Sequence, residues 1–250
     1  MTMRREIPVC GMKAVAAVFA RRPDCVKRLF FEPETGRAAG EFCKHLAREK
    51  RAYRQVSMEE LERIAGTVHH GGIVAITERE FAGEVTPEEI GEWSRARRGL
   101  VVLDRVGNPH NLGAIVRTAA FFGLPAVIHG VAREQALPGE STYRVAEGGM
   151  EYIDVRPVRG LPDFLRAIRP QYQTVGAALQ GQPLDRIETG SRGAGGRPVA
   201  LVLGNEERGL SGPVLAACER RALIPGTGAI ESLNVSAAAA ILMHWFFGRE

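Results

Sequence analysis

Apolar residues in the first 80 positions of the chain alternate between two kinds of spacing. Where they recur every three or four positions, they predict helices over residues 11–23, 38–50 and 57–66. Short apolar runs between or after these stretches predict strands over residues 26–31, 53–56 and 72–77. The front of the chain is therefore predicted to be a small α/β domain.

After residue 98 the apolar runs become more continuous. They predict strands over residues 100–104, 126–129, 152–158, 174–179, 199–204 and 222–225. Helical segments separate these strands, so we expect a mostly parallel sheet that is covered on both faces. A last apolar run, from Val235 to Phe247, predicts a core helix, because its 13 residues fall short of the roughly 20 that span a bilayer.

The stretch between these two parts, residues 79–98, is dense in charged residues and contains Gly and Pro. Such a composition is typical of a linker. We therefore predict a first domain over residues 1–78, a linker over residues 79–98, and a second domain over residues 99–250.

The composition describes a globular chain with reduced cysteines. Of its 250 residues, 45% are hydrophobic and 25% are charged, which is enough to bury a core. The four cysteines show no Cys-X-X-Cys spacing, which disfavours a zinc cluster and a disulfide framework. His69 and His70 are not accompanied by a second pair of ligands, so we expect no metal site. With no recognisable export signal or membrane segment, a cytoplasmic protein is the expectation.

Charge is distributed unevenly along the chain. From Arg4 to Arg54 there are 13 Lys and Arg against 6 Asp and Glu, whereas from Gln55 to Ser94 there are 2 against 9. A clustered basic surface is typical of a protein that binds the phosphate backbone of a nucleic acid. On charge alone, a solvated basic face without a partner is the alternative.

Ligands of a parallel α/β sheet bind at the carboxyl ends of its strands, and the first polar loop there begins at residue 108. In the sequence NPHNLGAIVRTAAFFG, Asn111 is a possible cap for the helix that follows. Gly113 and Arg117 lie four residues apart on one helix face, and the glycine suggests close approach of a ligand or of another backbone. Arg117 is suited to hold a phosphate or ribose oxygen. A surface arginine beside a tolerated glycine is the alternative.

The second polar loop follows the strand predicted over residues 199–204. Its sequence is LGNEERGLS, and Gly204 ends the strand where a missing side chain would let a flat ligand meet the backbone. Asn205 and Glu206 then place polar groups at this edge, and Ser211 is a possible helix cap. A capped turn without function is the alternative.

The third polar loop precedes the core helix. Ile224 and Pro225 end a strand, and a glycine-rich loop leads to Ser232, Leu233 and Asn234 at the helix start. The free N–H groups of a helix start can bind polar atoms. For Ser232 or Asn234 taken alone, a plain cap is the alternative.

The segments NPHNLGAIVRTAAFFG, LGNEERGLS and IPGTGAIESLNVSAAAA occur in this order, and each follows a predicted strand. Together they resemble the motifs of the SpoU (TrmH-like) RNA ribose methyltransferases of the SPOUT superfamily. The front domain resembles the small substrate-binding domain that is often fused to these enzymes, through GMKAVAAVF and VHHGGIVAI.

The resemblance implies a second domain with a C-terminal trefoil knot, which is a rare exception to unknotted chain topology. It also implies a homodimer through that domain, and S-adenosylmethionine as the cofactor. The residues that would hold this cofactor are Ala177, Gly204, Ile224 and Leu233. The apolar helix that ends in HWFF is long enough for a dimer surface, with burial within one chain as the alternative.

The reaction implied by the resemblance is methyl transfer to a ribose 2′-hydroxyl of structured RNA, either ribosomal or transfer RNA. The residues carried over to catalysis are Asn111, Arg117, Glu206, Ser232 and Asn234. A guanidinium keeps its protons at neutral pH. We therefore assign Arg117 to orienting the ribose and stabilising the developing alkoxide, and leave proton removal open.

Two other functions compete with this one. A Rossmann nucleotide-binding protein would need a GxGxxG turn after the first strand of the sheet, whereas GAGG at residues 193–196 lies in a polar loop. The other competitor is a catalytically idle RNA-binding protein that keeps the fold. The joint presence of Asn111, Arg117, Glu206 and Asn234 favours the enzyme.

Overall fold

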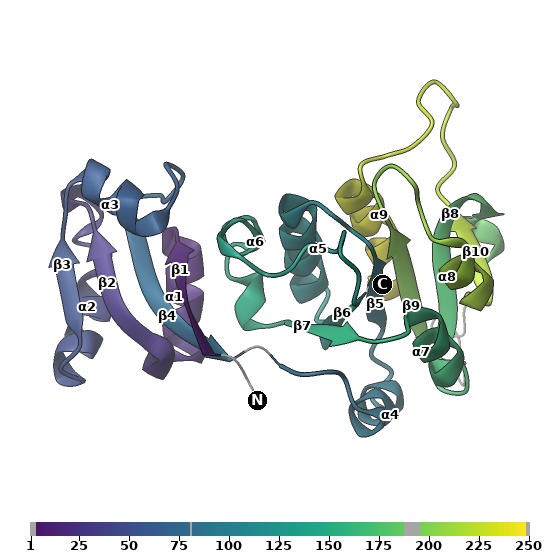
Figure 1. Cartoon of the computed structure of the whole chain (residues 1–250), viewed down its shortest axis with the longest axis horizontal. Coiled ribbons are helices and arrows are strands. Elements are labelled where there is room, and N and C mark those ends of the chain that lie inside the picture. The colour runs from purple at the N-terminus through teal and green to yellow at the C-terminus, as the bar shows by residue number, and fades with distance from the viewer. Residues whose placement is uncertain (1–3, 81, 188–195, 249–250) are drawn as a thin grey trace.

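The computed structural model describes residues 4–80, 82–187 and 196–248, and it consists of two α/β bodies that lie side by side (Figure 1). Most of the GAGG stretch, residues 193–195, lies outside the described residues. Among the described residues, no helix is long and apolar enough to cross a membrane.

The N-terminal body is a mixed sheet with helices on both faces. Its strands run in the order β1-β4-β2-β3, where β4 is antiparallel to β1 and β2, and β3 is parallel to β2. Their bounds are β1 (Arg4–Cys10), β2 (Val26–Phe31), β3 (Ala52–Gln55) and β4 (Ile73–Glu80). The helices are α1 (Met12–Arg21), α2 (Gly40–Arg48) and α3 (Met58–Ala65). The small α/β fold predicted for this part is confirmed, whereas β1 was not predicted.

Helices α1 and α2 bury apolar residues of one face of this sheet, and α3 buries those of the other. Val15 and Val18 of α1 pack in the same cluster as Leu29 of β2. Leu61 of α3 packs with Val74 of β4 in a separate cluster. Ser57 caps α3 and Gly66 ends it in the left-handed conformation, so the helix lies within the predicted range of residues 57–66.

The C-terminal body is a parallel sheet in the order β10-β8-β9-β5-β6-β7. Every pairing between these neighbours is parallel. The bounds are β5 (Leu100–Asp104), β6 (Ala126–Gly130), β7 (Asp154–Val158), β8 (Gln173–Pro183), β9 (Val199–Gly204) and β10 (Arg220–Leu223). This confirms the prediction of a mostly parallel sheet.

Both faces of this sheet are buried, because successive residues of each strand point to opposite sides. In β5, Val101 and Leu103 belong to the main core, and Leu100 and Val102 to the second one. The main core includes residues of α5 (Pro109–Phe121), α6 (Glu140–Ala146) and α9 (Val235–Phe247). The second core includes residues of α4 (Pro87–Arg95), α7 (Leu161–Ile168) and α8 (Gly212–Ala217).

The stretch that we assign to a linker contains α4. A capping box of Thr86 and Glu89 starts this helix, and Ile90 is buried against the sheet. Arg156 of β7 fastens the helix, because its guanidinium donates to the backbone carbonyls of Gly83 and Glu84 and pairs with Glu89 at 2.9 Å. The stretch therefore covers part of the sheet, and the domain boundaries that we drew around it stay predictions.

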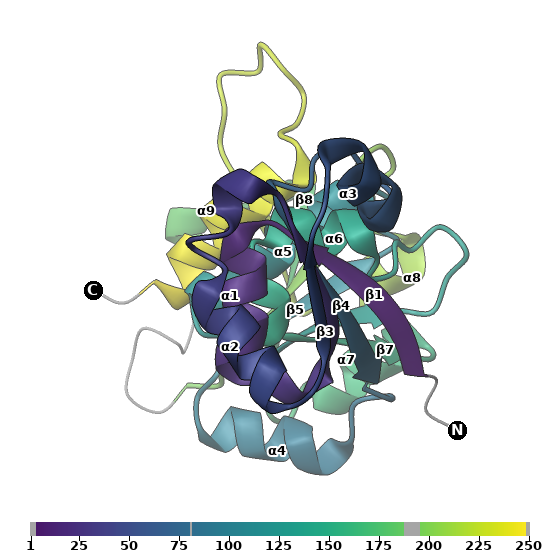
Figure 2. The ribbon, with the colours of Figure 1, turned by 90° about the vertical axis from the view of Figure 1, so that its left-hand side faces the viewer.

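The two bodies meet where α1 contacts α6 and the short helical turn Gly149–Glu151, and where β1 contacts α6 (Figure 1). Figure 2 looks onto the N-terminal body, with the C-terminal body behind it. The Glu151 side chain is 1% exposed and forms an ion pair with Arg22 at 2.5 Å. Arg79 lies 3.4 Å from the same carboxylate and donates to the carbonyl of Met150 at 2.8 Å. The junction is therefore fixed by a buried carboxylate between two guanidinium groups.

Candidate active site

The loops that follow β5, β9 and β10 are joined by hydrogen bonds between side chains. The side-chain amide of Asn111 donates to Oε1 of Glu206 at 2.8 Å, and Oδ1 of Asn111 accepts from Nδ2 of Asn234 at 3.1 Å. Asn111 lies in α5, Glu206 follows β9, and Asn234 precedes α9. The structure thus brings together three of the residues that we assigned to catalysis, and we call them the polar network.

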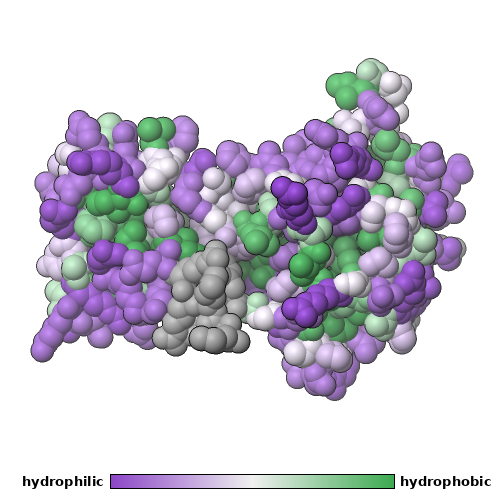
Figure 3. All heavy atoms as spheres, viewed as in Figure 1, coloured by the Kyte–Doolittle hydropathy of each residue, from purple (hydrophilic) through white to green (hydrophobic). Residues whose placement is uncertain are grey.

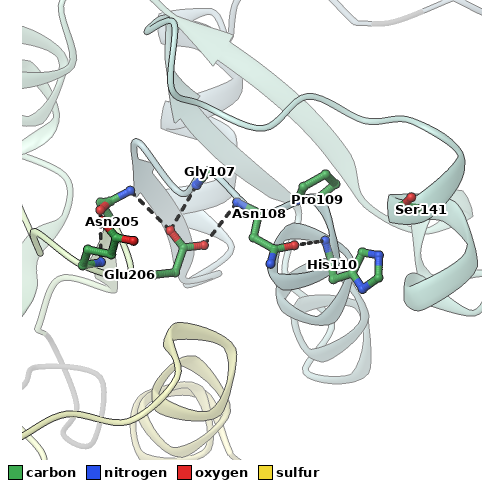
Figure 4. Close-up of a pocket in the computed structure, with 8 residues that line it drawn as sticks. Gly107, Asn108, Pro109, His110, Ser141, Asn205 and Glu206 are labelled. Carbon is green, nitrogen blue, oxygen red and sulfur yellow. Dashed lines mark hydrogen bonds between the residues drawn. The ribbon is translucent and has the colours of Figure 1, made fainter.

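Glu206 is the central acceptor of the polar network. Its carboxylate also accepts hydrogen bonds from the backbone N–H groups of Gly107 and Asn108, each at 3.2 Å, and from the side chain of Asn205 at 3.3 Å (Figure 4). Burial alone raises the pKa of Glu206, but the hydrogen bonds from Asn111 and from the backbone outweigh it and hold the pKa below its ordinary value. Glu206 is therefore ionised at neutral pH and ties the two loops together.

The expectation that Asn111 caps α5 is wrong. The helix begins at Pro109, and Asn108 is its N-cap, with a side-chain oxygen that accepts from the N–H of His110 at 2.8 Å. Proline is favourable in this first position because its missing N–H would have no partner there. Asn111 lies inside the first turn and is buried, so its side-chain amide reaches Glu206 instead of a backbone group.

Asn234 both belongs to the polar network and caps α9. Its side-chain oxygen accepts from the backbone N–H of Ser236 at 2.8 Å. The preceding segment, residues 225–234, is exposed throughout and stands away from the body of the protein, with apolar atoms near its tip (Figure 1, Figure 3). Ser232 lies in this segment, and the described residues give it no place in the polar network.

Arg117 lies apart from the polar network although it is on the same helix. Arg117 is six positions after Asn111. This spacing corresponds to about 9 Å along the helix axis and to a different face of α5. Nη2 of Arg117 is 3.1 Å from Oε2 of Glu147, and Nζ of Lys13 is 3.0 Å from the same oxygen. The structure therefore places Arg117 at the junction with the N-terminal body.

Gly204 and Gly113 make room for neighbouring backbone. A Cβ on Gly204 would lie 2.3 Å from the carbonyl carbon of Gly209, because the loop after β9 folds back over the strand end. A Cβ on Gly113 would lie 2.8 Å from the carbonyl oxygen of Thr142 in α6. On the side where a Cβ would point, the space beside Gly204 is thus filled by its own loop rather than by a ligand. The assignment of the Gly204 backbone to the cofactor stays a prediction.

Three of the four candidate cofactor residues lie in or directly after neighbouring strands of the sheet. Ala177 lies in β8 just beyond its last pairing with β9, Gly204 ends β9, and Ile224 follows β10. Ala177 and Ile224 are partly buried against the main core. Leu233 is 51% exposed in the projecting segment. Because β10, β8 and β9 are neighbours in the sheet, three of these residues lie on adjacent strands although they are distant in sequence.

An open depression of about 620 Å³ lies beside the polar network, and α6 provides its far wall through Ser141 (Figure 4). It is lined by Gly107, Asn108, Pro109, His110, Ser141, Asn205, Glu206 and Glu207. Sequence reasoning missed Asn108, His110 and Ser141. The Asn-Pro pair is a helix-start signal that identifies Asn108, whereas Ser141 has no local signal because it reaches the site only through the packing of α6 on α5.

A parallel α/β sheet with polar loops at the carboxyl ends of its strands belongs to the class of α/β proteins that bind ligands at those strand ends. The chain belongs to the SpoU rRNA methylase family, whose family model matches residues 99–244. A second family model, for the substrate-binding domain of RNA 2′-O ribose methyltransferases, matches residues 8–81.

Curated relatives agree with this assignment, and a solved structure shares the fold. An uncharacterized tRNA/rRNA methyltransferase of Haemophilus influenzae is 36% identical over 73% of this chain, which spans about half of that relative, 52% of its length. The 23S rRNA (guanosine-2′-O-)-methyltransferase RlmB of Nitrosomonas europaea is 31% identical over 94% of this chain and 88% of its own length. The fold is similar to that of the SpoU methyltransferase AviRb from Streptomyces viridochromogenes in complex with AdoMet. That structure has a TM-score of 0.75 and 21% identity, and the match covers 97% of this chain and 89% of that one.

Proposed function

We propose that this protein transfers a methyl group from S-adenosylmethionine to a ribose 2′-hydroxyl of structured ribosomal or transfer RNA. The observation that carries the proposal is the polar network, because it joins the three loops by which the chain resembles its family. Family membership supports the reaction, and the relative from Nitrosomonas europaea is named for 2′-O-methylation of a ribosomal RNA.

The residues at the edge of the sheet fit S-adenosylmethionine. Ala177 and Ile224 offer partly buried apolar surface, and Leu233 leaves about half of its surface exposed. In the part of the chain that the structure describes, no backbone N–H from Gly226 to Leu233 donates to a backbone carbonyl, and that of Ala229 donates to Oγ1 of Thr227 at 3.4 Å. The other donors of this segment are open to a ligand. We propose that Ala177, Gly204, Ile224 and Leu233 hold the cofactor, which when bound supplies the activated methyl group.

Arg117 is proposed to orient the ribose. Displacement at carbon requires the attacking oxygen to lie in line with the bond that breaks, so positioning supplies much of the rate acceleration. A guanidinium offers several fixed N–H donors that can hold ribose and phosphate oxygens and stabilise charge developing on the 2′-oxygen. Asn111, Glu206 and Asn234 hold the loops of the site, and Ser232 is proposed to contact the substrate. The acceptor of the hydroxyl proton stays unassigned.

We propose a homodimer through the second domain, in which Arg117 of one copy acts at the cofactor of the other. Within one chain Arg117 and the polar network occupy different faces of α5, which supports a site built from two copies. Helices α5 and α9 pack together and leave apolar side chains at their surface, with Phe121 82% exposed and Ile241 41% exposed. Such a surface is suited to a partner helix.

The trefoil knot also stays a proposal. From the edge strand β10 the chain returns to place α9 on one face of the sheet, against the interior strand β9 and beside α5, and this return path supports a threaded C-terminus. The N-terminal body is proposed to bind RNA through its shape, phosphates and 2′-hydroxyls. Because ribosomal and transfer RNA are the proposed substrates, we also propose that the protein acts in the cytoplasm.

The proposal is tested with unmodified transcripts of ribosomal and transfer RNA and S-adenosylmethionine that carries a labelled methyl group. We expect 2′-O-methylnucleosides in one class of transcript, detected by nuclease digestion and mass spectrometry. The Arg117→Ala variant is expected to bind S-adenosylmethionine like the wild type but to transfer no methyl group. Binding of RNA without any binding of S-adenosylmethionine would refute the proposal and indicate an idle RNA-binding protein.

Mixing two inactive variants tests whether the site is shared between copies. Arg117→Ala is co-expressed with Leu233→Asp, which places a charge in the proposed cofactor site. If the site is shared, half of the dimers are mixed and each has one intact site, so about a quarter of wild-type activity returns. If both groups act within one chain, every site lacks one of them, and the mixture stays inactive.

A further inference from the structure

Glu147 stands between the two bodies of the protein and contacts a cation from each. Its Oε2 lies 3.0 Å from Nζ of Lys13 on α1 and 3.1 Å from Nη2 of Arg117 on α5. The hydrogen bond from Lys13, and then the charge of Arg117, hold the pKa of Glu147 below its ordinary value. One ionised oxygen is therefore shared between the N-terminal body and the arginine.

The backbone at Glu147 is unfavourable for a residue with a side chain. Glu147 follows the last residue of α6 with a φ of 43°, in the left-handed conformation where glycine is usually found. A non-glycine residue in this conformation is uncommon and draws attention to a role for the side chain. Glycine would satisfy the local backbone better, so the carboxylate is not explained by the turn.

The two residues that follow Glu147 pack the junction tightly. A Cβ on Gly148 would lie 2.7 Å from Cβ of Ala17 on α1, and a Cβ on Gly149 would lie 3.1 Å from Cα of Arg117. The turn is thus wedged between α1 and the backbone that carries Arg117. This close packing fixes the position of Glu147 relative to both cations.

We infer that Glu147 is a positioning residue that holds the Arg117 guanidinium in the orientation required for methyl transfer. Because Lys13 binds the same carboxylate, this orientation also depends on how the N-terminal body packs against the C-terminal body. The inference rests on the proposed role of Arg117. Its consequence is that the orientation of Arg117 depends on Lys13, a residue of the N-terminal body.

The geometry explains why a carboxylate is needed. Glu147 contacts Arg117 through Nη2, and the guanidinium side chain is 54% exposed, so its other N–H donors remain available to an RNA oxygen. Without the carboxylate, Lys13 and Arg117 would face each other as like charges, and Arg117 would turn toward solvent. A long side chain that is free to turn makes the productive geometry rare, and a displacement of about 1 Å can lower a rate by about a hundredfold.

The test compares variants that keep the left-handed turn but change the carboxylate. Glu147→Asn tolerates this backbone conformation without charge, Glu147→Gly removes the backbone strain, and Glu147→Asp keeps a shorter carboxylate. Lys13→Ala removes the contribution of the N-terminal body. The matched control is Glu41→Gln, which breaks the exposed pair of Glu41 and Lys44 on α2.

We expect Glu147→Asn and Glu147→Gly to lower kcat about ten- to a hundredfold, with an unchanged Kd for S-adenosylmethionine. Their Tm should equal or exceed that of the wild type, because the strained backbone is relieved. Glu147→Asp should restore part of the rate, and Lys13→Ala should lower kcat by a smaller factor. An NMR signal of the Arg117 side chain, assigned by its loss in Arg117→Ala, should shift in both Glu147→Asn and Lys13→Ala.

A kcat within twofold of wild type in Glu147→Asn, or a rise in kcat, overturns the inference. A rate unchanged in Lys13→Ala overturns the coupling to the N-terminal body. A fall in kcat that is matched by a fall in Tm indicates a structural role and also overturns it. If the wild-type protein transfers no methyl group to any transcript, the proposed function is refuted instead. The NMR shift would still test whether Glu147 holds the Arg117 side chain.

Discussion

Replacing Glu206 with glutamine tests whether the polar network holds the loops of the site together. Each carboxylate oxygen accepts from two of the described N–H groups, with Asn108 and Asn111 on Oε1 and Gly107 and Asn205 on Oε2. A glutamine amide keeps one oxygen, so its NH₂ group faces two N–H donors whichever way the amide is turned. Two hydrogen bonds to a charged acceptor are therefore lost.

The size of the effect follows from these bonds. Hydrogen bonds to charged groups contribute about 1.5–3 kcal/mol each when buried. Glu206 is only half-buried, so water replaces part of the loss, and we expect the free energy of unfolding to fall by about 2–3 kcal/mol. For a chain of this size this corresponds to a decrease of about 4–12 °C in Tm. Methyl transfer should fall as well, because the loops after β5 and β9 lose their common anchor.

The effect should also depend on pH in a defined direction. The folded protein holds the pKa of Glu206 below the ordinary value of about 4.5. A carboxylate with a lowered folded pKa contributes its full stability above the unfolded pKa, and this stability is lost as the pH falls through the folded pKa. The difference between wild type and Glu206→Gln should therefore be constant from pH 7 to about pH 5 and shrink below about pH 4.5.

Urea denaturation at pH 7, 5 and 4 measures both the size and the pH dependence. The matched control is Glu207→Gln, because Glu207 is the exposed neighbour, and among the described residues its one hydrogen bond runs from its backbone N–H to Oδ1 of Asn205 at 3.1 Å. This control should change the free energy of unfolding by less than about 0.5 kcal/mol. Equal stability of the two variants at pH 7 would show that the four donors around Glu206 do not need a charged acceptor.

The remaining predictions concern the junction, the dimer surface and the glycines. Glu151→Gln should lower the free energy of unfolding by about 3 kcal/mol in urea denaturation, because it leaves two guanidinium groups at the junction without their carboxylate; a loss below about 1 kcal/mol would contradict this. Phe121→Glu should convert a dimer into a 27.2 kDa monomer in sedimentation, and an unchanged dimer would place the interface elsewhere. Gly204→Ala should lower the free energy of unfolding by about 1–3 kcal/mol, because its Cβ would collide with the backbone of Gly209. Gly91→Ala in α4 should raise the free energy of unfolding by up to about 1 kcal/mol, because a Cβ there meets nothing within 4 Å. Similar Tm values for these two glycine variants would argue against close backbone approach at Gly204.

The sequence predicts well the elements whose signal is local. The strands over residues 26–31, 100–104 and 199–204 occur where their apolar runs indicate. The strand β1 was missed because Pro8 and charged residues interrupt its run, and it is held by pairing with β4 along its whole length. The polar end of β8 was missed for a similar reason, since residues 180–183 carry no apolar pattern and extend beside β10.

Part of the candidate site could likewise be predicted from local sequence signals, and part could not. The polar residues at the ends of strands could be predicted, because parallel strands bring their carboxyl ends to one edge. Asn111 was placed at the wrong position in its helix, because the stronger start signal is the pair Asn108 and Pro109. The partner of Arg117 could not be predicted, because Glu147 is 30 residues away and reaches it only through the packing of α6 on α5.

Helix α5 carries both halves of the candidate site and joins them mechanically. Asn111 near its start is fixed to Glu206 and Asn234, and Arg117 further along is fixed to Glu147 at the junction. One face of this 13-residue helix is buried along its length, and close packing of that face resists displacement of single turns. A shift of the N-terminal body therefore cannot reorient Arg117 by moving the helix without disturbing the polar network as well. The side chain of Arg117 can change its orientation alone. Under the proposed function, its contact with Glu147 is therefore where RNA bound to the N-terminal body would act on the reaction.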